Sequence, residues 1–423
     1  MMLVNRPQAS KNSIFSGILL AYTLYASFVF GATDAYAVNT SAAAVNLEGP
    51  RYFIKTANPF WQKSFGVRHI FDGGFTADLS GIQMALAKFF GVEVEPVKEL
   101  HILPELNLNE ISVKEVAKLP VKNNTRALPS DQTPWGIEII YGDSMISSTV
   151  GGEGVNVAVL DTGVLKTHPD LKDRVRQCKD FTNLRVPIKD GSCDDKNGHG
   201  THVSGIILAD SGSDNLGIYG IAPQANLFAY KVCGNNGSCW ADDIAVALRT
   251  AADNGSNVIN LSLGSDEESF LIREAVDYAV SKDVLIVAAA GNDGPYPLSI
   301  DYPAANSKVV GVGAIDILSS VPDWSSLGDN SNSLAYKVEE KDMEFGAPGL
   351  SVESAWKNGG YTILSGTSMA SPHIAGLAAK MWQGLVLEGT RAQATRDLLH
   401  QLAKDIWTAG DDDATGFGLP QVK

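Results

Sequence analysis

Three short segments of this chain of 423 residues contain polar side chains in surroundings that suit catalysis. Asp161 follows a run of apolar residues, His199 stands between two glycines, and Ser368 lies in the small-residue segment 366–371. A serine hydroxyl is a weak nucleophile unless a base removes its proton, and the base needs a carboxylate that holds its tautomer. Asp161, His199 and Ser368 are therefore candidates for an acyl-transfer site.

The residues around these candidates indicate where a developing negative charge would be stabilised. We expect His199 and Ser368 to lie at helix starts, where free backbone N–H groups and the positive end of the helix dipole favour an oxyanion. Small neighbours allow a peptide backbone to approach closely. Asn292 follows another apolar run and is a further candidate, although an isolated Asn-Asp-Gly is ordinarily a turn.

Two other chemistries share parts of these motifs. Aspartic proteases also use Asp-Thr-Gly, but they need a second matching motif, and this chain contains one such triplet. His199 and His202 are spaced three apart like a metal-binding pair, yet the glutamate of H-E-x-x-H is absent. Neither motif alone is as specific as the three segments together.

The elements that must position these residues alternate between strands and helices. Apolar runs predict buried strands at 155–160, 225–232, 258–261, 284–288 and 309–313, and helical periodicity predicts helices at 200–209, 241–254, 267–281 and 366–386. This alternation indicates an α/β fold with a doubly wound, mainly parallel sheet and helices on both faces. Sites in such sheets form at the carboxyl ends of the strands, where Asp161, Ser262 and Asn292 lie.

A smaller unit precedes this sheet. Residues 51–55 and 92–97 have the pattern of strands and residues 79–90 that of a helix, which predicts a small α+β domain at about 49–106. Residues 107–133 are polar and read as an exposed linker. We expect three parts, at residues 1–37, 38–126 and 127–423.

The first part has the features of an export signal. Arg6 and Lys11 precede an uncharged stretch from Ile14 to Thr33, and the segment 35–37, Ala-Tyr-Ala, has the form of a signal-peptidase site. We expect a secreted protein, with an uncleaved membrane anchor as the alternative.

The four cysteines fit an oxidising compartment. Three disulfide connectivities are possible, and we expect the local pairs Cys178–Cys193 and Cys233–Cys239. Zinc is the competing interpretation, but no C-x-x-C spacing supports it.

The charge of the chain bears on its partners. The formal net charge is −15, and residues 130–423 contain 21 basic against 38 acidic side chains. Such a surface repels phosphate backbones, so we expect no nucleic-acid partner.

The segments around Asp161, His199 and Ser368, in this order, resemble the subtilisin-like serine proteases over about residues 134–422. Residues 50–106 are similar to the subtilisin-type inhibitory propeptide, with Arg68–Phe75 as its central segment. The resemblance implies a secreted serine endopeptidase, made as a self-processing precursor and acting on extended polypeptides as a monomer. It implies that Asn292 is the side-chain oxyanion donor.

The resemblance also implies where substrate binds. Two edge segments would clamp an extended peptide, and further residues would line the pocket for the residue before the scissile bond: Gly237, Ser238, Ser262, Leu263, Gly264, Ala290, Gly291 and, at its floor, Asp301. Subtilisin-like enzymes that favour large apolar residues usually have a small residue at the position of Asp301. If Asp301 and Asp293 face the pocket, basic side chains could be accepted; both could equally be solvated loop carboxylates. Arg126 is then a candidate for the residue preceding the mature amino terminus.

Structural calcium is the expected cofactor, again through the resemblance. The residues concerned are Asp170, Asp131, Asp214, Asn215, Leu216 and Ile218, and oxygen ligands of this kind suit calcium. We expect no catalytic metal. A subtilisin fold without catalysis and a dinucleotide-binding oxidoreductase are the alternatives; all four catalytic positions are filled, and no G-x-G-x-x-G follows the first strand.

Overall fold

The computed structural model describes residues 50–103, 127–330, 337–382 and 389–422, which belong to one unit, Gly49–Lys423. Its main element is an eight-stranded sheet in which every neighbouring pair is parallel except the last, β7 with β8. The spatial order is β15 (Phe345–Pro348), β14 (Val310–Ile315), β13 (Leu285–Ala289), β11 (Val258–Leu261), β6 (Asn156–Asp161), β9 (Asn226–Lys231), β7 (Val175–Asp180) and β8 (Lys189–Asp190).

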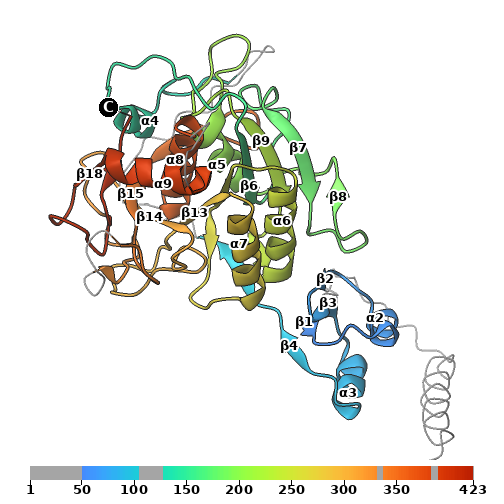
Figure 1. Cartoon of the computed structure of the whole chain (residues 1–423). Coiled ribbons are helices and arrows are strands. Elements are labelled where there is room, and N and C mark those ends of the chain that lie inside the picture. The colour runs from blue at the N-terminus through green and yellow to red at the C-terminus, as the bar shows by residue number, and fades with distance from the viewer. Residues whose placement is uncertain (1–49, 104–126, 331–336, 383–388, 423) are drawn as a thin grey trace, which may run out of the picture. The chain divides into compact units, whose positions relative to one another are not determined.

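Both faces of this sheet are covered by helices (Figure 1). Along β6, Val157 and Val159 enter one apolar cluster while Ala158 and Leu160 enter another, because successive side chains of a strand point to opposite faces. The first cluster includes side chains of α4 (Trp135–Tyr141), α5 (His199–Leu208), α8 (Thr367–Lys380) and α9 (Arg391–Leu402). The second includes α6 (Ala241–Asp253) and α7 (Phe270–Ser281). The predicted doubly wound α/β fold is confirmed.

Two of the predicted helices differ from the structure by more than one residue at one end. The helix expected at 267–281 begins at Phe270, because Ser265 Oγ donates to the Glu267 carbonyl in a turn and Ser269 is the N-cap. The helix expected at 366–386 ends at Lys380, with Met381 as its C-cap, and residues 383–386 lie outside the described part of the chain.

The amino-terminal described residues form the predicted α+β unit. Its antiparallel sheet has the order β2 (Ile70–Phe71), β3 (Gly74–Asp78), β1 (Arg51–Ile54) and β4 (Val94–Pro96). Helices α2 (Pro59–Phe65) and α3 (Gly81–Phe89) complete it, and α3 begins at a capping box in which Ser80 and Gln83 satisfy each other's backbone N–H groups. Ile54 and Phe75 are the fully buried centre of its own small core.

A strand from the segment after this unit pairs with two strands of the larger part. β5 (Glu99–Ile102) is the middle strand of an antiparallel sheet, between β10 (Ser238–Trp240) and β12 (Leu263–Gly264). The remaining strands form two hairpin-like pairs, β16 (Val352–Ala355) with β17 (Tyr361–Leu364) and β18 (Ala403–Lys404) with β19 (Leu419–Pro420).

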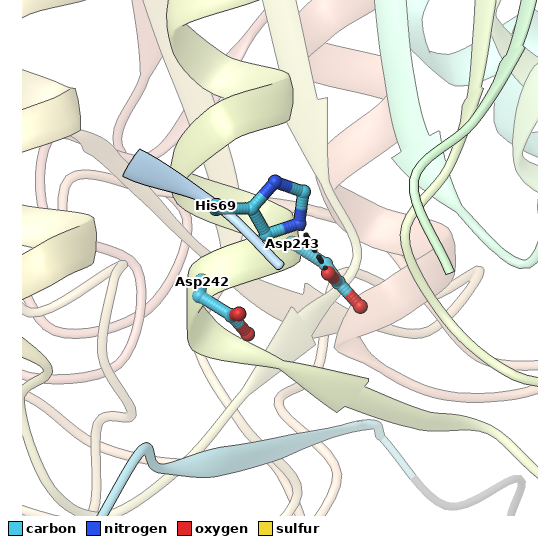
Figure 2. A group of neighbouring side chains, drawn as sticks. All are labelled: His69, Asp242 and Asp243. Carbon is cyan, nitrogen blue, oxygen red and sulfur yellow. Dashed lines mark hydrogen bonds and ion pairs between the residues drawn. The ribbon is translucent and has the colours of Figure 1, made fainter. Parts of the chain in front are cut away.

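A buried charge cluster joins the α+β unit to the first turn of α6 (Figure 2). Asp243 accepts from Arg51 at 3.1 Å, from Nε and Nη2 of Arg68 at 3.2 and 3.1 Å, and from Nε2 of His69 at 2.8 Å. Asp242 accepts from Arg51 at 2.8 Å. Burial raises the pKa of Asp243, but the hydrogen bond from His69 and the charges of both arginines outweigh it and hold this pKa below its ordinary value.

Both disulfides have the expected pairing, Cys178–Cys193 and Cys233–Cys239. The predicted signal peptide, the greater part of the linker and Arg126 lie outside the described residues. Among the residues that are described, no helix combines the length and the apolar character needed to cross a bilayer.

Candidate active site

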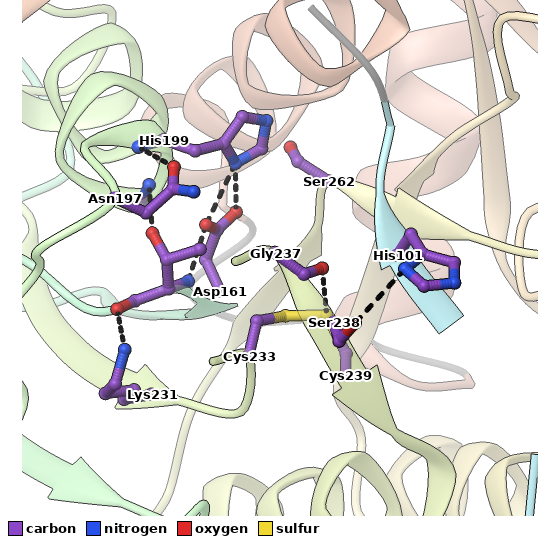
Figure 3. The surroundings of a disulfide bond; sticks show 12 residues. His101, Asp161, Asn197, His199, Lys231, Cys233, Gly237, Ser238, Cys239 and Ser262 are labelled. Carbon is purple, nitrogen blue, oxygen red and sulfur yellow. Dashed lines mark hydrogen bonds and ion pairs between the residues drawn. A yellow bond between two sulfur atoms is a disulfide. The ribbon is translucent and has the colours of Figure 1, made fainter. Parts of the chain in front are cut away.

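Asp161 and His199 form a fully buried pair. Asp161 is the last residue of β6, and His199 is the first residue of α5. Nδ1 of His199 lies 2.9 Å from each carboxylate oxygen of Asp161 (Figure 3). A carboxylate in this position fixes the ring orientation and favours the tautomer with the proton on Nδ1. The geometry presents Nε2 as the basic atom.

Two residues that the sequence analysis did not single out hold this pair in place. The Thr162 N–H donates to Asp161 at 2.6 Å, and its hydroxyl donates to Asp195 at 2.9 Å. Asp195 in turn accepts the N–H groups of Gly198 and Thr201 at 2.7 and 2.9 Å. Asp195 thus accepts hydrogen bonds from free backbone N–H groups at the start of α5, and its negative charge interacts favourably with the positive end of the helix dipole. Its signal in the sequence is an acidic residue shortly before a predicted helix.

Ser368 is the second residue of α8 and is 2% exposed. Its hydroxyl donates to the Ser262 carbonyl at 3.2 Å, and the Ser262 hydroxyl donates to the Ser368 carbonyl at 2.9 Å. Asn260 links Ser262 to Ser371, with bonds of 3.0 and 2.6 Å. This buried polar chain fixes the first turn of α8 against β11 and the residue that follows it.

Asn292 and the backbone of Ser368 border the same small space. The Asn292 carbonyl oxygen accepts both the N–H and the hydroxyl of Thr367, at 3.0 Å each, which sets the orientation of its amide. A methyl group on Gly366 would lie 3.3 Å from Nδ2 of Asn292 and 3.7 Å from the Ser368 nitrogen. The two nitrogens therefore lie close to one another at a helix start, the kind of place where an oxyanion is stabilised.

The predicted peptide-binding segments form the two edges beside β5 (Figure 3). Ser238 lies opposite His101, and Leu263 and Gly264 lie opposite Ile102 and His101. The Ile102 N–H donates to the Gly237 carbonyl at 2.9 Å. A strand held by main-chain bonds on both sides is the arrangement in which an extended peptide is recognised.

Ala290, Gly291 and Asp301 also lie together, as predicted. The Asp301 N–H donates to the Ala290 carbonyl at 2.8 Å, and Gly291 leads directly into Asn292. The Asp301 side chain is buried rather than solvated, with the residue 3% exposed. Burial and the nearby charges of Asp293 and Asp266 raise the pKa of Asp301 to about 8.

Asp170 contacts the loop 214–218, which contains residues that we named as candidate calcium ligands. Oδ2 of the buried Asp170 accepts from the Ile218 N–H at 3.1 Å and from the Tyr361 hydroxyl at 2.7 Å. Asp214 accepts from Leu216 within the loop, at 3.2 Å. Nε2 of Gln132, a residue that the sequence analysis did not name, donates to the carbonyl oxygens of Asn215 and Gly217 at 2.8 and 3.0 Å.

Asp131 itself has other contacts. Its carboxylate accepts from the Thr133 N–H at 3.0 Å, and its own N–H donates to Glu353 at 3.2 Å.

His202, the second histidine of the candidate metal pair, contacts backbone instead. Its Nε2 lies 3.1 and 3.2 Å from the carbonyl oxygens of Val352 and Thr362. Burial, with a smaller effect of His199, lowers the pKa of His202 to about 3, so this imidazole is neutral and structural.

Comparisons with known proteins agree with this geometry. Residues 152–418 match the model of the subtilase family. A subtilisin of Bacillus sp. (strain TA39) is 42% identical over 97% of this chain and 99% of its own length. The M-protease of Shouchella clausii (strain KSM-K16) is 38% identical over 78% of this chain and 80% of its own. The solved structure of sphericase matches with a TM-score of 0.67 and 48% identity, over 70% of this chain and 100% of that one.

Proposed function

The chain belongs to the subtilase family of serine proteases, and from this membership we propose that Ser368, His199 and Asp161 are its catalytic triad. The single observation that supports the assignment most strongly is the buried Asp161–His199 pair, at 2.9 Å, in which His199 begins α5, a helix that contacts α8, the helix that contains Ser368. The reaction is hydrolysis of a peptide bond in an extended polypeptide, through an acyl-enzyme.

The proposed mechanism assigns each step to an atom. The Ser368 hydroxyl leaves the Ser262 carbonyl and attacks the substrate carbonyl carbon, while Nε2 of His199 takes its proton and returns it to the leaving amine. Asp161 holds the ring and stabilises the imidazolium. Nδ2 of Asn292 and the Ser368 N–H stabilise the oxyanion. Water then attacks the acyl-enzyme, with His199 again as the base.

We also propose that residues 38–126 are an inhibitory propeptide. β5 fills the strand position between β10 and β12 that a substrate peptide needs, so the segment and a substrate compete for the same main-chain groups. The buried contacts of Arg51 and Arg68 with α6 anchor it. Residues 1–37 serve as the signal peptide of a secreted protein, and residues 127–423 act as a monomeric enzyme.

Calcium is the proposed structural ion of the loop 214–218. The carboxylate of Asp170 and the carbonyl oxygens of Asn215 and Gly217 supply oxygen ligands of the kind that a hard cation prefers. Gln132, whose Nε2 donates to both carbonyl oxygens, would join this set by turning its amide oxygen toward the ion. Asp214, Leu216 and Ile218 stay further candidates, and Gln132 replaces Asp131 in the proposed set. A bound calcium ion would stabilise this loop; the chemistry at Ser368 needs none of it.

Casein hydrolysis by purified protein tests the proposed function. The wild-type chain should process itself and then hydrolyse casein, whereas Ser368→Ala should accumulate at precursor length. His199→Ala should behave in the same way, because without its base the serine is a weak nucleophile. Full activity in both variants would refute the triad.

A further inference from the structure

Three carboxylates meet beside the proposed catalytic residues. One oxygen of each of Asp266, Asp293 and Asp301 lies within 4.8 Å of the others. Asp266 and Asp293 are exposed, and Asp301 is buried. Like charges this close repel one another, so a proton or a cation among the members stabilises the group.

The buried member of this group has an unsatisfied oxygen. Oδ1 of Asp301 accepts no hydrogen bond from the described residues, and no arginine, lysine or histidine among them forms an ion pair with this side chain. The side chain does have a hydrogen bond with Asp266, another carboxyl group. A buried carboxylate whose neighbours are carboxyl groups is costly, so its presence indicates a bound proton or a cationic partner. The surrounding segments add no positive charge: 263–266 and 290–294 contribute Asp266 and Asp293, and 325–327 contributes the Ser326 hydroxyl near Gly291.

The position of Asp301 connects it to the peptide site. A methyl group on Gly264 would lie 2.8 Å from Oδ2 of Asp301, and one on Gly291 would lie 2.9 Å from the same oxygen. Gly264 belongs to β12, the edge that pairs with β5, and Gly291 precedes Asn292. The carboxylate is thus between the peptide-binding edge and the oxyanion donors.

The strand register identifies which substrate residue would reach this carboxylate. Leu263 pairs with Ile102 and Gly264 with His101, and the same antiparallel register, extended by one residue, would place Ser262 opposite Leu103. Ser262 is bonded to Ser368 in both directions. A residue in the place of Leu103 is therefore the one whose peptide group is nearest to Ser368.

We propose that Asp301, supported by Asp266 and Asp293, recognises the cationic side chain of arginine or lysine in the substrate residue before the scissile bond. This specificity rests on the proposed function. The guanidinium or ammonium group would supply a cationic partner for Asp301. A hydrogen bond between two charged groups is stronger than a hydrogen bond between two neutral groups. The acidic charge of residues 130–423 attracts basic peptides to the same region.

The protonation state of Asp301 depends on the side chain that occupies the place of the substrate residue before the scissile bond. Leu103 is apolar and 5% exposed, so the side chain in the place of this substrate residue brings no positive charge, and the titratable side chains of β5, Glu99 and His101, are exposed. With such an occupant the pKa of Asp301, raised to about 8 by burial and by Asp293 and Asp266, keeps the carboxyl protonated at neutral pH. Above that pH the carboxylate forms and favours a cation. Discrimination in favour of arginine should therefore grow as the pH rises through about 8.

Two matched peptide substrates, differing only in arginine or phenylalanine before the scissile bond, test the proposal on the self-processed protein. We expect the ratio of kcat/KM for arginine over phenylalanine to increase at least about tenfold between about pH 6 and about pH 10, the effect of one charged hydrogen bond. Arginine stays protonated throughout this range. Asp301→Asn should abolish the increase while phenylalanine is still hydrolysed.

Two further variants complete the test. Glu153→Gln removes one negative charge from the loop at the amino end of β6, whereas Asp161 lies at the carboxyl end of this strand, and the variant should keep the wild-type profile. Asp266→Asn retains Asp301 but removes a like charge, so the increase should shift to lower pH; this variant keeps the test valid if Asp301→Asn does not fold.

The proposal would be overturned if the ratio of kcat/KM for arginine over phenylalanine were the same in the wild-type protein and in Asp301→Asn. Loss of a bound calcium ion in Asp301→Asn, without a change in that ratio, would overturn it as well. Absence of hydrolysis of both substrates by the wild-type protein would instead refute the proposed function.

Discussion

Replacing Asp243 by asparagine should loosen the amino-terminal unit from the remainder of the protein. The carboxylate of Asp243 accepts four hydrogen bonds from Arg51, Arg68 and His69, and all four residues are at most 8% exposed. The substitution leaves two buried guanidinium groups without this charge. Breaking a buried ion pair costs about 3–5 kcal/mol, and we take about 3 kcal/mol because the asparagine oxygen still accepts a bond.

At 1.4 kcal/mol per factor of ten, this loss corresponds to about 10²-fold weaker association of the unit. Hydrogen exchange in the Ser368→Ala background, which prevents processing, measures it through the amides of β1 and β5. Their protection should fall by about that factor in Asp243→Asn. Asp253→Asn, an exposed carboxyl at the other end of α6, is the matched control. Unchanged protection of β1 and β5 in Asp243→Asn would refute the role given to this cluster.

Three other predictions concern the catalytic and structural sites. Asn292→Ala should lower kcat by about 10²–10³, the effect of removing the corresponding donor in subtilisin, with little change in Tm; an unaltered kcat would exclude it as an oxyanion donor. Chelation should lower Tm, and Asp170→Asn should remove the dependence of Tm on added calcium, which stabilises by about 2.7 kcal/mol at a concentration of about 100 Kd. Glu344 is buried, which raises its pKa, but Arg396 and His400 outweigh this and lower it. The stabilisation of the folded state by the Glu344 carboxylate is therefore present above the ordinary glutamate pKa and is lost as the pH falls through the lowered pKa. Glu344→Gln should lower the free energy of unfolding by about 3–5 kcal/mol at neutral pH and by progressively less in acid, which calorimetry can measure.

Some parts of the site could be predicted because their signals are local. Asp161 stands at the end of an apolar run, and His199 and Ser368 stand among small residues, so strand ends and helix starts could be assigned from neighbouring residues alone. The alternation of apolar runs and amphipathic segments likewise predicted the sheet and its covering helices. Both short disulfide loops followed from the spacing of the cysteines.

Other parts depend on contacts between distant segments. Asp195 acts on Asp161 only through Thr162 and the start of α5. Gln132 is a neutral side chain that reaches a loop about eighty residues away, and its neighbour Asp131 has the more conspicuous charge. Whether Asp301 is solvated or buried depends on how closely Gly264 and Gly291 approach it, which no local pattern reveals.

The most direct test of the account is covalent labelling of the self-processed protein with a fluorophosphonate, followed by mass spectrometry of the labelled peptide. The account predicts one label, on Ser368, and a loss of casein hydrolysis in proportion to labelling. Casein hydrolysis that persists in fully labelled protein, or a label on another serine, would contradict it.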